Sequence, residues 1–326
     1  SKGNGSKYDL NDRSKFSITL DLKNDESINE LKKLIRQVDA VFEGFRPGVM
    51  EKLGLGPNDL LSINGKLVYG RMTGWGQEGL FSDMAGHDLN YLSITGALNA
   101  IGRKDERPPV PLNLIADYGG GGMLLAVGML SALIHSQKTG KGQVVDAAMI
   151  DGTSMLMSLF YSFYGSGVWS NERESNLLDG AAHFYDTYEC KDGKYIAVAC
   201  IEDKFYKEML DKLEITDEKF SKQFSKDIWP ELKSKLGEKF LSKNRDEWAM
   251  IFQNSDACIT PILDLDEAPK HEHNKSRSTF IERDGVVQPN PSPRFSETPL
   301  EIKSSPKEIG EDNILISEKY NINLQN

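Results

Sequence analysis

The chain has 326 residues, of which 39% are hydrophobic; this is enough for one large or two medium packed domains and too many for a disordered protein. Its net charge is −10 and its pI about 5.2, which argues against nucleic-acid binding but is compatible with a phosphorylated ligand at a local basic patch. The three cysteines, Cys190, Cys200 and Cys258, fit no zinc spacing, so we expect free thiols in an intracellular, reducing compartment.

The sequence carries no targeting signal that we recognise. The longest strongly apolar run, residues 123–134, is shorter than the ~20 residues that a membrane-spanning helix needs, so we expect no membrane span. We recognise no signal peptide in these residues, and the C-terminal NLQN is not a peroxisomal address, so we expect that cytoplasm, mitochondrion and peroxisome all stay open. Because the chain opens on Ser1 and a polar stretch, we expect its natural beginning to lie upstream.

The first part of the chain alternates predicted strands and helices. The expected elements are a strand at 16–22 (FSITLDL), a helix at 25–35, a strand at 39–45, a short helix at 49–53 and a strand at 67–72. The strands are short and rich in apolar and β-branched residues, and the longer helix has its apolar residues on one face. Strands separated by helices at this spacing predict a parallel sheet with crossover helices.

The pattern changes at His183. Before it we expect an apolar helix at 117–134, a strand at 143–148, an apolar segment at 149–164 and an irregular stretch at 168–182. After it we expect a hairpin of 184–190 with 194–200, helices at 203–213 and 227–243, and an extended proline-containing tail. We therefore expect an α/β fold with a large domain over residues 1–150, a linker over 151–183, a smaller α+β domain over 184–270 and a segment over 271–326 that returns to the large domain.

His87 and Asp117 are the candidate acid/base residues. His87 lies where a helix is expected to start, and the partial positive charge of a helix N-terminus favours the neutral imidazole that can accept a proton. The simpler alternative is a capping or surface histidine. Asp117 precedes four glycines, which let a ligand approach the backbone closely, but an aspartate there is also an ordinary helix cap. Local sequence alone slightly favours the structural role for both.

Other polar residues give weaker signals. Arg46, Lys52 and Lys23 lie at strand ends or in the loops after strands, where ligands bind in open α/β sheets, although ordinary surface charge is the usual alternative. His271 and His273 flank Glu272 without a further ligand set, so we expect no metal site. The GxGxxG and GxxxxGK phosphate motifs and the Gly-x-Ser-x-Gly elbow are all absent from the sequence.

Several segments, in order over nearly the whole chain, match one known group of proteins. They are 45–49 (FRPGV), 85–91 (AGHDLNY), 111–114 (PLNL), 117–121 (DYGGG), 140–147 (GKGQVVDA), 256–262 (DACITPI), 267–269 (EAP) and 293–295 (PRF). Together they resemble the family III CoA-transferases, the CaiB/BaiF superfamily, and within it the branch of alpha-methylacyl-CoA racemases. The resemblance implies a Rossmann-like large domain, a smaller α+β domain and an interlocked homodimer.

The resemblance also discriminates between activities. The transferases use the aspartate that matches Asp117 as a nucleophile and generally lack a histidine at the position of His87, whereas the racemases have both, as this chain does. It therefore implies racemisation of 2-methylacyl-CoA thioesters, in lipid metabolism, by two-base exchange of the α-proton through an enolate. A CoA-transferase acting between carboxylic acids and an inactive CoA-binding homologue remain the alternatives. The family's first strand, with an arginine for the CoA phosphates, has no counterpart here.

Residue roles follow from the same resemblance. His87 would serve the (S) ester and Asp117 the (R) ester, with Glu202 hydrogen-bonded to His87 across the dimer. Coenzyme A, as part of the substrate and with no further cofactor, would contact three groups of residues: Leu20, Asp21, Leu22 and Lys23 near the adenine; Gly44, Phe45, Arg46 and Lys52 near the phosphates; and Gly86, His87, Asp88, Leu89, Asn90 and Tyr91 near the thioester. The identity of the acyl chain stays open.

Overall fold

The computed structural model describes residues 7–324, which divide into two compact units. Unit 1 contains the described residues up to Ala85, then Gly122–Ala148, and the chain from Asp264 onward. Unit 2 contains Gly86–Gly121 and Met149–Leu263. The expected large domain, linker, small domain and return segment stay predictions, and the expectation about what precedes Ser1 lies outside the described residues.

Unit 1 is built around a parallel sheet of three strands in the order β1-β2-β3. Val68 of β2 pairs with Ala40 of β1 and with Gln143 of β3. The elements of this unit are η1 (Leu10–Asp12), α1 (Asp25–Ile35), β1 (Ala40–Glu43), α2 (Val49–Lys52), α3 (Pro57–Ile63), β2 (Val68–Thr73), α6 (Leu124–Thr139), β3 (Gln143–Ala148), η5 (Ala268–Lys270), α12 (Glu272–Ser276), β7 (Phe280–Arg283), β8 (Val286–Pro289) and α13 (Asn313–Tyr320). The mixed α/β architecture with a parallel sheet predicted from the sequence is confirmed.

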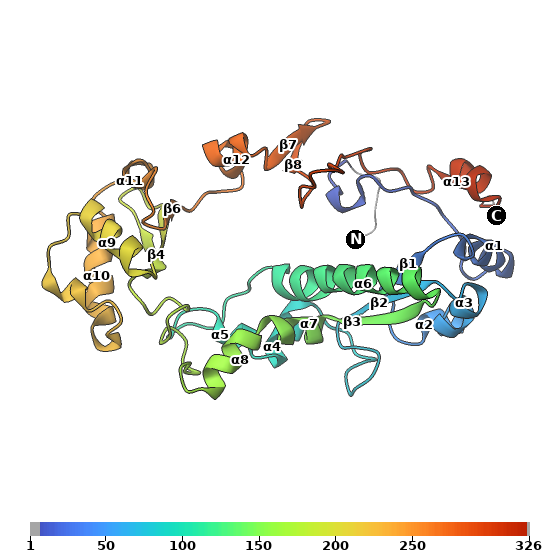
Figure 1. Ribbon diagram of the computed structural model, residues 1–326, viewed down its shortest axis with the longest axis horizontal. Coiled ribbons are helices and arrows are strands. Elements are labelled where there is room, and N and C mark those ends of the chain that lie inside the picture. The colour runs from blue at the N-terminus through green and yellow to red at the C-terminus, as the bar shows by residue number, and fades with distance from the viewer. Residues whose placement is uncertain (1–6, 325–326) are drawn as a thin grey trace. The chain divides into compact units, whose positions relative to one another are not determined.

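Helix α6 lies along β2 and β3 (Figure 1). Gly70 of β2 makes the close approach possible, because a Cβ there would lie 2.8 Å from the Met129 sulfur and 3.0 Å from Leu125 Cδ1. Together with the preceding π-helix, α6 forms a helical segment, Leu114–Thr139, of 26 residues, which by length and composition could cross a membrane. The apolar run 123–134, on which the sequence analysis based its expectation, covers only part of this helical segment. The contacts of α6 with the sheet favour a sheet-covering helix, and the absence of a membrane span stays a prediction.

Residues 16–22 form no strand, contrary to expectation. The backbone N–H of Ser17 donates to Asp312 Oδ2 and that of Thr19 donates to Asn313 Oδ1, both at 2.9 Å. A strand needs the carbonyl and N–H groups of a neighbouring strand, and here side chains at the start of α13 take that place. The segment is therefore anchored to the C-terminal part of the chain rather than to the sheet.

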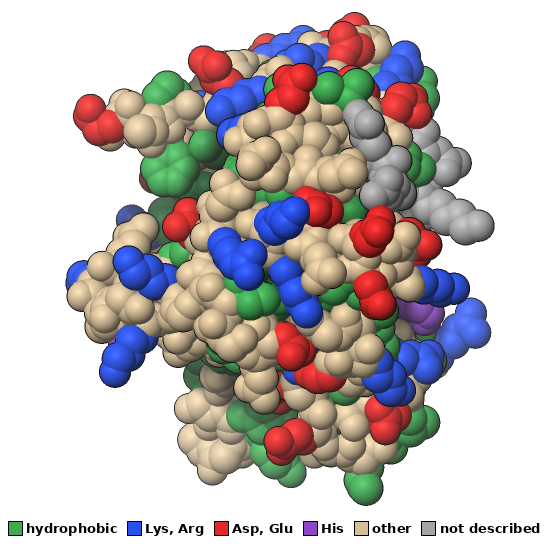
Figure 2. All heavy atoms as spheres, turned by 90° about the vertical axis from the view of Figure 1, so that its right-hand side faces the viewer, with side chains coloured by type: hydrophobic (Ala, Val, Ile, Leu, Met, Phe, Trp, Pro, Cys, Tyr) green, Lys and Arg blue, Asp and Glu red, His purple; other side chains and the backbone are tan. Residues whose placement is uncertain are grey.

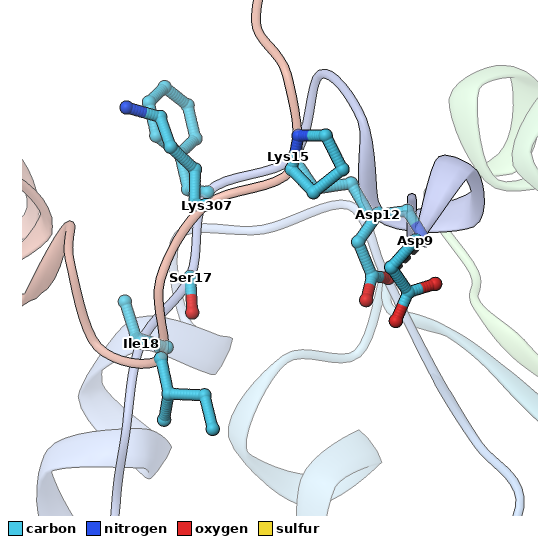
Figure 3. A pocket seen from close by; sticks show the side chains of 9 residues that line it. Asp9, Asp12, Lys15, Ser17, Ile18 and Lys307 are labelled. Carbon is cyan, nitrogen blue, oxygen red and sulfur yellow. Dashed lines mark ion pairs between the residues drawn. The ribbon is translucent and has the colours of Figure 1, made fainter. Parts of the chain in front are cut away.

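The N-terminal and C-terminal segments of unit 1 also enclose a cavity of about 390 Å³ (Figure 3). Both lysines that line it pair locally: Lys15 lies 3.5 Å from Asp12, and Lys307 lies 2.7 Å from Glu311. The face of this unit that carries α1, α3 and α13 shows basic and acidic side chains intermixed (Figure 2). Neither the cavity nor this face carries charged side chains of a single sign.

Unit 2 contains an antiparallel sheet in the order β4-β5-β6. Its elements are α4 (Asp88–Ile94), α5 (Ala97–Ala100), most of the π-helix η2 (Leu114–Met123), α7 (Met149–Leu156), α8 (Ser158–Gly165), β4 (Tyr185–Glu189), β5 (Tyr195–Ala199), α9 (Asp203–Lys212), η3 (Glu218–Ser221), η4 (Lys226–Ile228), α10 (Trp229–Phe240), α11 (Arg245–Phe252) and β6 (Ile259–Pro261). The predicted hairpin forms at Gly193, whose φ of +74° suits a glycine in a tight turn. Large buried side chains, among them Phe184, Phe240 and Trp248, fill the core beside this sheet.

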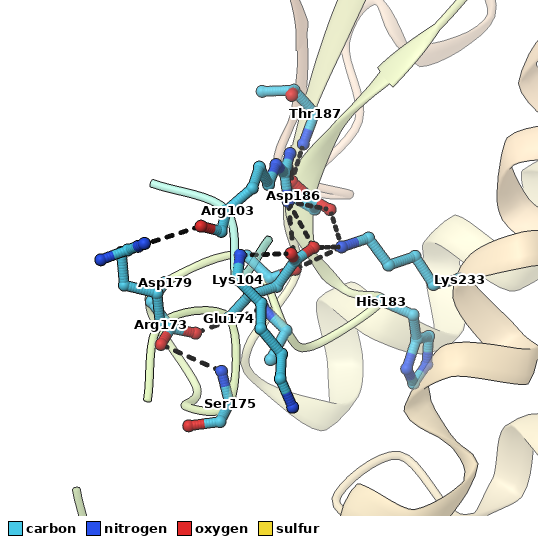
Figure 4. A network of polar contacts seen from close by, with 12 residues as sticks. Arg103, Lys104, Arg173, Glu174, Ser175, Asp179, His183, Asp186, Thr187 and Lys233 are labelled. Carbon is cyan, nitrogen blue, oxygen red and sulfur yellow. Dashed lines mark hydrogen bonds and ion pairs between the residues drawn. The ribbon is translucent and has the colours of Figure 1, made fainter. Parts of the chain in front are cut away.

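The irregular stretch before β4 is held by a network of ion pairs (Figure 4). Arg103 Nη1 lies 3.0 Å from Glu174 Oε1, and Arg103 Nη2 lies 2.6 Å from Asp186 Oδ1 on β4. Lys233 of α10 contacts the same two carboxylates, at 2.5 and 2.7 Å. Four charges thus fix this stretch against β4 and α10, although it contains no helix or strand of its own.

Candidate active site

His87 immediately precedes the first residue of α4. Its backbone N–H donates to Asn90 Oδ1 at 3.1 Å, and the Asn90 N–H donates back to the His87 carbonyl oxygen at 2.8 Å. These two bonds fix the first turn of the helix. The imidazole is exposed and forms no hydrogen bond within residues 7–324, so its ring nitrogens are available to a ligand.

Asp88, the next residue, points the other way. Its side chain is buried, with the residue only 4% exposed. One carboxylate oxygen, Oδ2, accepts from the backbone N–H of Ala116 at 2.8 Å and of Asp117 at 2.9 Å. The other oxygen, Oδ1, is buried and has no hydrogen-bond partner among the described residues. The two residues that flank the start of α4 therefore join an exposed imidazole to the backbone of Asp117.

Asp117 lies in the first part of the π-helix η2, and not at a helix cap as the simpler interpretation had it. Its Oδ2 accepts a hydrogen bond from Asn113 Nδ2 at 3.2 Å, and the side chain is half-buried. Asp117 also lies near Tyr91, since burial first and the Asp117 charge second raise the pKa of that phenol.

The glycine run after Asp117 serves helix packing. A Cβ on Gly120 would lie 2.7 Å from the Thr153 nitrogen of α7, closer than a carbon atom can approach without displacing the backbone. Gly120 is buried. The suggestion that the glycines open the backbone to a ligand therefore does not apply to Gly120, because α7 occupies that space.

Glu202 is the residue before α9, and its side chain is exposed. The Glu202 carboxylate forms no hydrogen bond to another described residue, and therefore none to His87, whereas its backbone carbonyl oxygen accepts from the N–H groups of Phe205 and Tyr206. Its role as the partner of His87 stays a prediction.

The loop expected to bind the CoA phosphates follows β1 in unit 1. The Phe45 N–H donates to Glu43 Oε2 at 2.6 Å, and Glu43 Oε1 in turn accepts from Arg71 Nε at 3.1 Å. Arg71 also binds Glu51 of α2 at 2.7 Å. Burial opposes ionisation of Glu51, but the hydrogen bonds and charge of Arg71 still hold its pKa below the ordinary value. A cluster of one arginine and two carboxylates thus anchors this loop and the helix after it.

The cations predicted to contact coenzyme A are not used in that cluster. Arg46, Lys52 and Lys23 are exposed and form no ion pair among the residues that the structure describes. Lys23 lies in the turn before α1, where its N–H donates to Asp21 Oδ1 at 2.9 Å. Leu20 packs against the C-terminal apolar cluster around Ile316. Gly44, Phe45, Arg46 and Lys52 are close in sequence and belong to unit 1, whereas Gly86–Tyr91 belong to unit 2.

A largely apolar cavity of about 410 Å³ lies inside unit 2. Its lining comes mainly from α5, η2, α7 and α8 and includes Ala97, Ala100, Ile101, Ile115, Leu156, Met157, Phe160 and Trp169. Ile115 is two residues before Asp117. This is the kind of enclosure that an apolar ligand group fills.

No group of three or more potential metal-ligating side chains occurs in the part of the chain that the structure describes. His271 and His273 lie at the start of α12. All three cysteines are free thiols, as predicted, with Cys190 and Cys200 buried and Cys258 exposed.

Sequence reasoning missed two sets of residues at the candidate site. The first is the side chain of Asp88, which binds the backbone of Ala116, 28 residues further along the chain. The second is the Glu43–Arg71–Glu51 cluster, in which Arg71 binds Glu43, also 28 residues away. The available signal was an ionisable residue inside an otherwise apolar element, since such residues are rarely buried unless they are paired.

Comparison with known proteins places the chain in a family. A model described as CoA-transferase family III matches residues 1–313. The chain is 42% identical over 311 residues to alpha-methylacyl-CoA racemase of Mus musculus, covering 94% of this chain and 81% of the relative. It is 44% identical over 298 residues to that of Homo sapiens, covering 90% and 78%. A crystal structure of a CaiB/BaiF family protein from Brucella suis matches with a TM-score of 0.80 at 26% identity, covering 95% of this chain and 82% of that one. The chain belongs to CoA-transferase family III, as the sequence motifs predicted.

Proposed function

We propose that this protein is an isomerase that racemises 2-methylacyl-CoA thioesters. The proposal rests on Asp88, whose carboxylate binds the Asp117 backbone and which directly follows His87 at the start of α4. The identity of 42% to 44% with racemases supports it. A histidine and a carboxylate held by one short structural link are the two groups that a two-base exchange requires.

The chemistry demands more than a base. A hydrogen next to a thioester is so weakly acidic that transfer to a base near neutral pH is uphill by roughly a dozen pKa units, on the order of 16 kcal/mol. The charge that develops on the enolate oxygen must therefore meet preorganised donors. The Asp88 backbone N–H is such a donor, because it opens α4 and forms no hydrogen bond to another described residue.

The two bases act in turn on opposite faces of the planar enolate. When the (S) ester binds, His87 takes the α-proton and protonated Asp117 delivers a proton to the other face. When the (R) ester binds, Asp117 takes the proton and the His87 imidazolium returns one. Glu202 of the small α+β domain would hydrogen-bond the imidazole and stabilise its charged form.

Coenzyme A would be held by exposed cations and backbone in unit 1. Arg46 and Lys52 form no ion pair among the described residues, so their charges are free for the phosphates, and the Glu43–Arg71–Glu51 cluster fixes the loop that presents them. The turn from Leu20 to Lys23 would contact the adenine. The acyl chain would enter the apolar cavity beside Ile115, where Met157 adapts to branched shapes.

The active form would be an interlocked homodimer with a Rossmann-like large domain and a smaller α+β domain in each copy. Helix α6 supports an assembly, because its residues Val127, Leu130 and Ile134, together with Met123 directly before it, form an exposed apolar stripe. Their spacing of three and four residues places them on one face of the helix. A stripe of this kind is usually covered by another molecule.

The activity is tested with purified (R)- and (S)-2-methylacyl-CoA in the presence of a free carboxylic acid. A racemase converts either enantiomer to a near-equal mixture and leaves CoA on its original acid. A transferase instead moves CoA to the added acid and leaves an acyl adduct on Asp117, which mass spectrometry of the protein detects. An inactive CoA-binding homologue does neither, and either of these two outcomes contradicts the proposal.

A further inference from the structure

We propose that Asp88 is a positioning residue, whose carboxylate sets the place of Asp117 relative to His87. The proposal rests on the two-base function proposed above and adds a residue to it. Asp88 does not touch the reacting atoms through its side chain, because that side chain is buried and directed at the backbone of Ala116 and Asp117. Its effect reaches the substrate only through Asp117.

The geometry explains why such a residue is needed. The N–H groups in the first turn of a helix have no carbonyl partner within that helix. In η2, which begins at Leu114, the N–H groups of Ala116 and Asp117 belong to this class, and one oxygen of Asp88 accepts both. The start of η2 is thus capped from another helix, and that helix begins beside His87.

The same bond links the two proposed bases through one residue. His87 and Asp88 are adjacent, and Asp88 binds the Asp117 backbone in a single step. On the other side of Asp117, Asn113 holds the carboxylate at 3.2 Å. Backbone and side chain of Asp117 are therefore fixed by separate partners, which leaves the carboxylate little freedom to move relative to the imidazole.

A carboxylate suits this task better than an amide or a hydroxyl. Backbone N–H groups bind an anionic acceptor more strongly than a neutral one, and the site is sheltered from water. Burying Oδ1 without a hydrogen-bond partner among the described residues costs free energy, which the strong bonds of Oδ2 to the two N–H groups must offset. A requirement for a rigid Asp117 accounts for it.

The test compares Asp88→Ala and Asp88→Asn with the control Thr95→Val. Thr95 is buried at the end of the same helix, but its hydroxyl donates only to the Leu92 carbonyl oxygen of that helix. All three variants keep the backbone N–H of residue 88. Each enantiomer is incubated separately in D₂O, and exchange of the α-hydrogen and inversion of the centre are measured in the same sample.

The expected signature is an uncoupling of exchange from inversion. With Asp117 displaced, His87 still removes the α-proton of the (S) ester, the imidazolium exchanges its proton with D₂O, and a deuteron returns to the same face. Asp88→Ala should therefore lower inversion about 100-fold, the effect of a displacement of about 1 Å, while the (S) ester still exchanges. Asp88→Asn, which keeps an oxygen acceptor, should lower inversion about tenfold. Thr95→Val should keep the wild-type ratio of exchange to inversion.

A second readout does not depend on activity. Amide hydrogen exchange, followed by mass spectrometry over residues 114–123, should be faster in Asp88→Ala than in wild type, and unchanged in Thr95→Val. Unaltered protection there, or equal loss of exchange and inversion from both enantiomers in Asp88→Asn, would overturn the positioning role. A wild-type protein that exchanges neither ester would sink the proposed function instead, so the two failures are distinguishable.

Discussion

Gly152 lies against Gly120 so closely that a Cβ on Gly152 would be 1.8 Å from the Gly120 carbonyl oxygen. The π-helix that carries Asp117 and helix α7 therefore meet backbone to backbone. This contact determines where Asp117 lies relative to α7, and it depends on the absence of side chains at both positions.

Gly152→Ala should lower the free energy of unfolding by about 3 kcal/mol, because the new methyl group can fit only if one helix moves. Chemical denaturation measures the change. Gly165→Ala is the matched control: Gly165 is the last residue of α8, and a Cβ there meets no atom within 4 Å. That variant should be neutral or slightly more stable. Equal effects of the two substitutions would show that the helix crossing does not constrain the fold.

Removing the Arg71 guanidinium should destabilise unit 1 and weaken substrate binding together. In Arg71→Met, buried Glu43 loses its counter-charge, and we expect a loss of about 3 kcal/mol in the free energy of unfolding. Because Glu43 also holds the Phe45 N–H, the KM for acyl-CoA should rise more than kcat falls. The double variant Glu43→Gln with Arg71→Met should recover part of the stability. If the double variant loses more free energy of unfolding than the two single variants lose together, the charge argument is wrong.

His183 should make unit 2 less stable in mild acid. The imidazole is fully buried, its Nε2 lies 2.7 Å from the Tyr206 hydroxyl, and burial lowers its pKa to about 4. An unfolded histidine titrates near 6.5, so below that pH the unfolded chain binds the proton and the folded one does not. Stability from this group is complete above about pH 6.5 and falls by about 1.4 kcal/mol per pH unit as the pH drops toward 4.

Urea denaturation at pH 7, 6 and 5 measures that slope. His183→Gln removes the titrating ring and should flatten the difference between pH 6 and pH 5, where the carboxylates are still ionised. A variant with the same slope as wild type would assign the acid sensitivity to another group.

The sequence predicted most of the sheet of unit 1, and the roles of the site residues stay predictions. Residues 40–43, 68–73 and 143–148 were recognisable as strands because they follow a local sequence rule. Short runs rich in apolar and β-branched residues favour strands, and such side chains also suit a packed sheet. Residues 16–22 follow the same rule and form no strand, because a strand needs a neighbour and local sequence does not say which neighbour is present. Family motifs pointed to His87 and Asp117, whereas Asp88 was placed only among the residues near the thioester. Its side-chain contact joins α4 to η2, segments about 28 residues apart in the chain, and no local pattern encodes such a contact.

The exposed stripe on α6 should govern assembly. Val127→Glu or Leu130→Glu places a charge among apolar side chains that a second copy would cover. Light scattering should find wild type at twice the 36.4 kDa of the single chain. Both variants should shift toward the mass of the monomer. Gln137→Glu, an equal change of charge on α6, should leave the dimer intact. A wild-type monomer, or a dimer unaffected by either substitution, would rule out this surface.

The most direct test of the two-base account is exchange of the α-hydrogen in D₂O by single-base variants. Wild type should exchange both enantiomers. His87→Gln should lose exchange from the (S) ester by about 100-fold or more while the (R) ester still exchanges, and Asp117→Asn should show the reverse. Exchange at the wild-type rate in both variants would contradict the account. Loss of α-hydrogen exchange from both enantiomers in Asp117→Asn, together with an acyl adduct on Asp117 in the wild-type protein, would also contradict it.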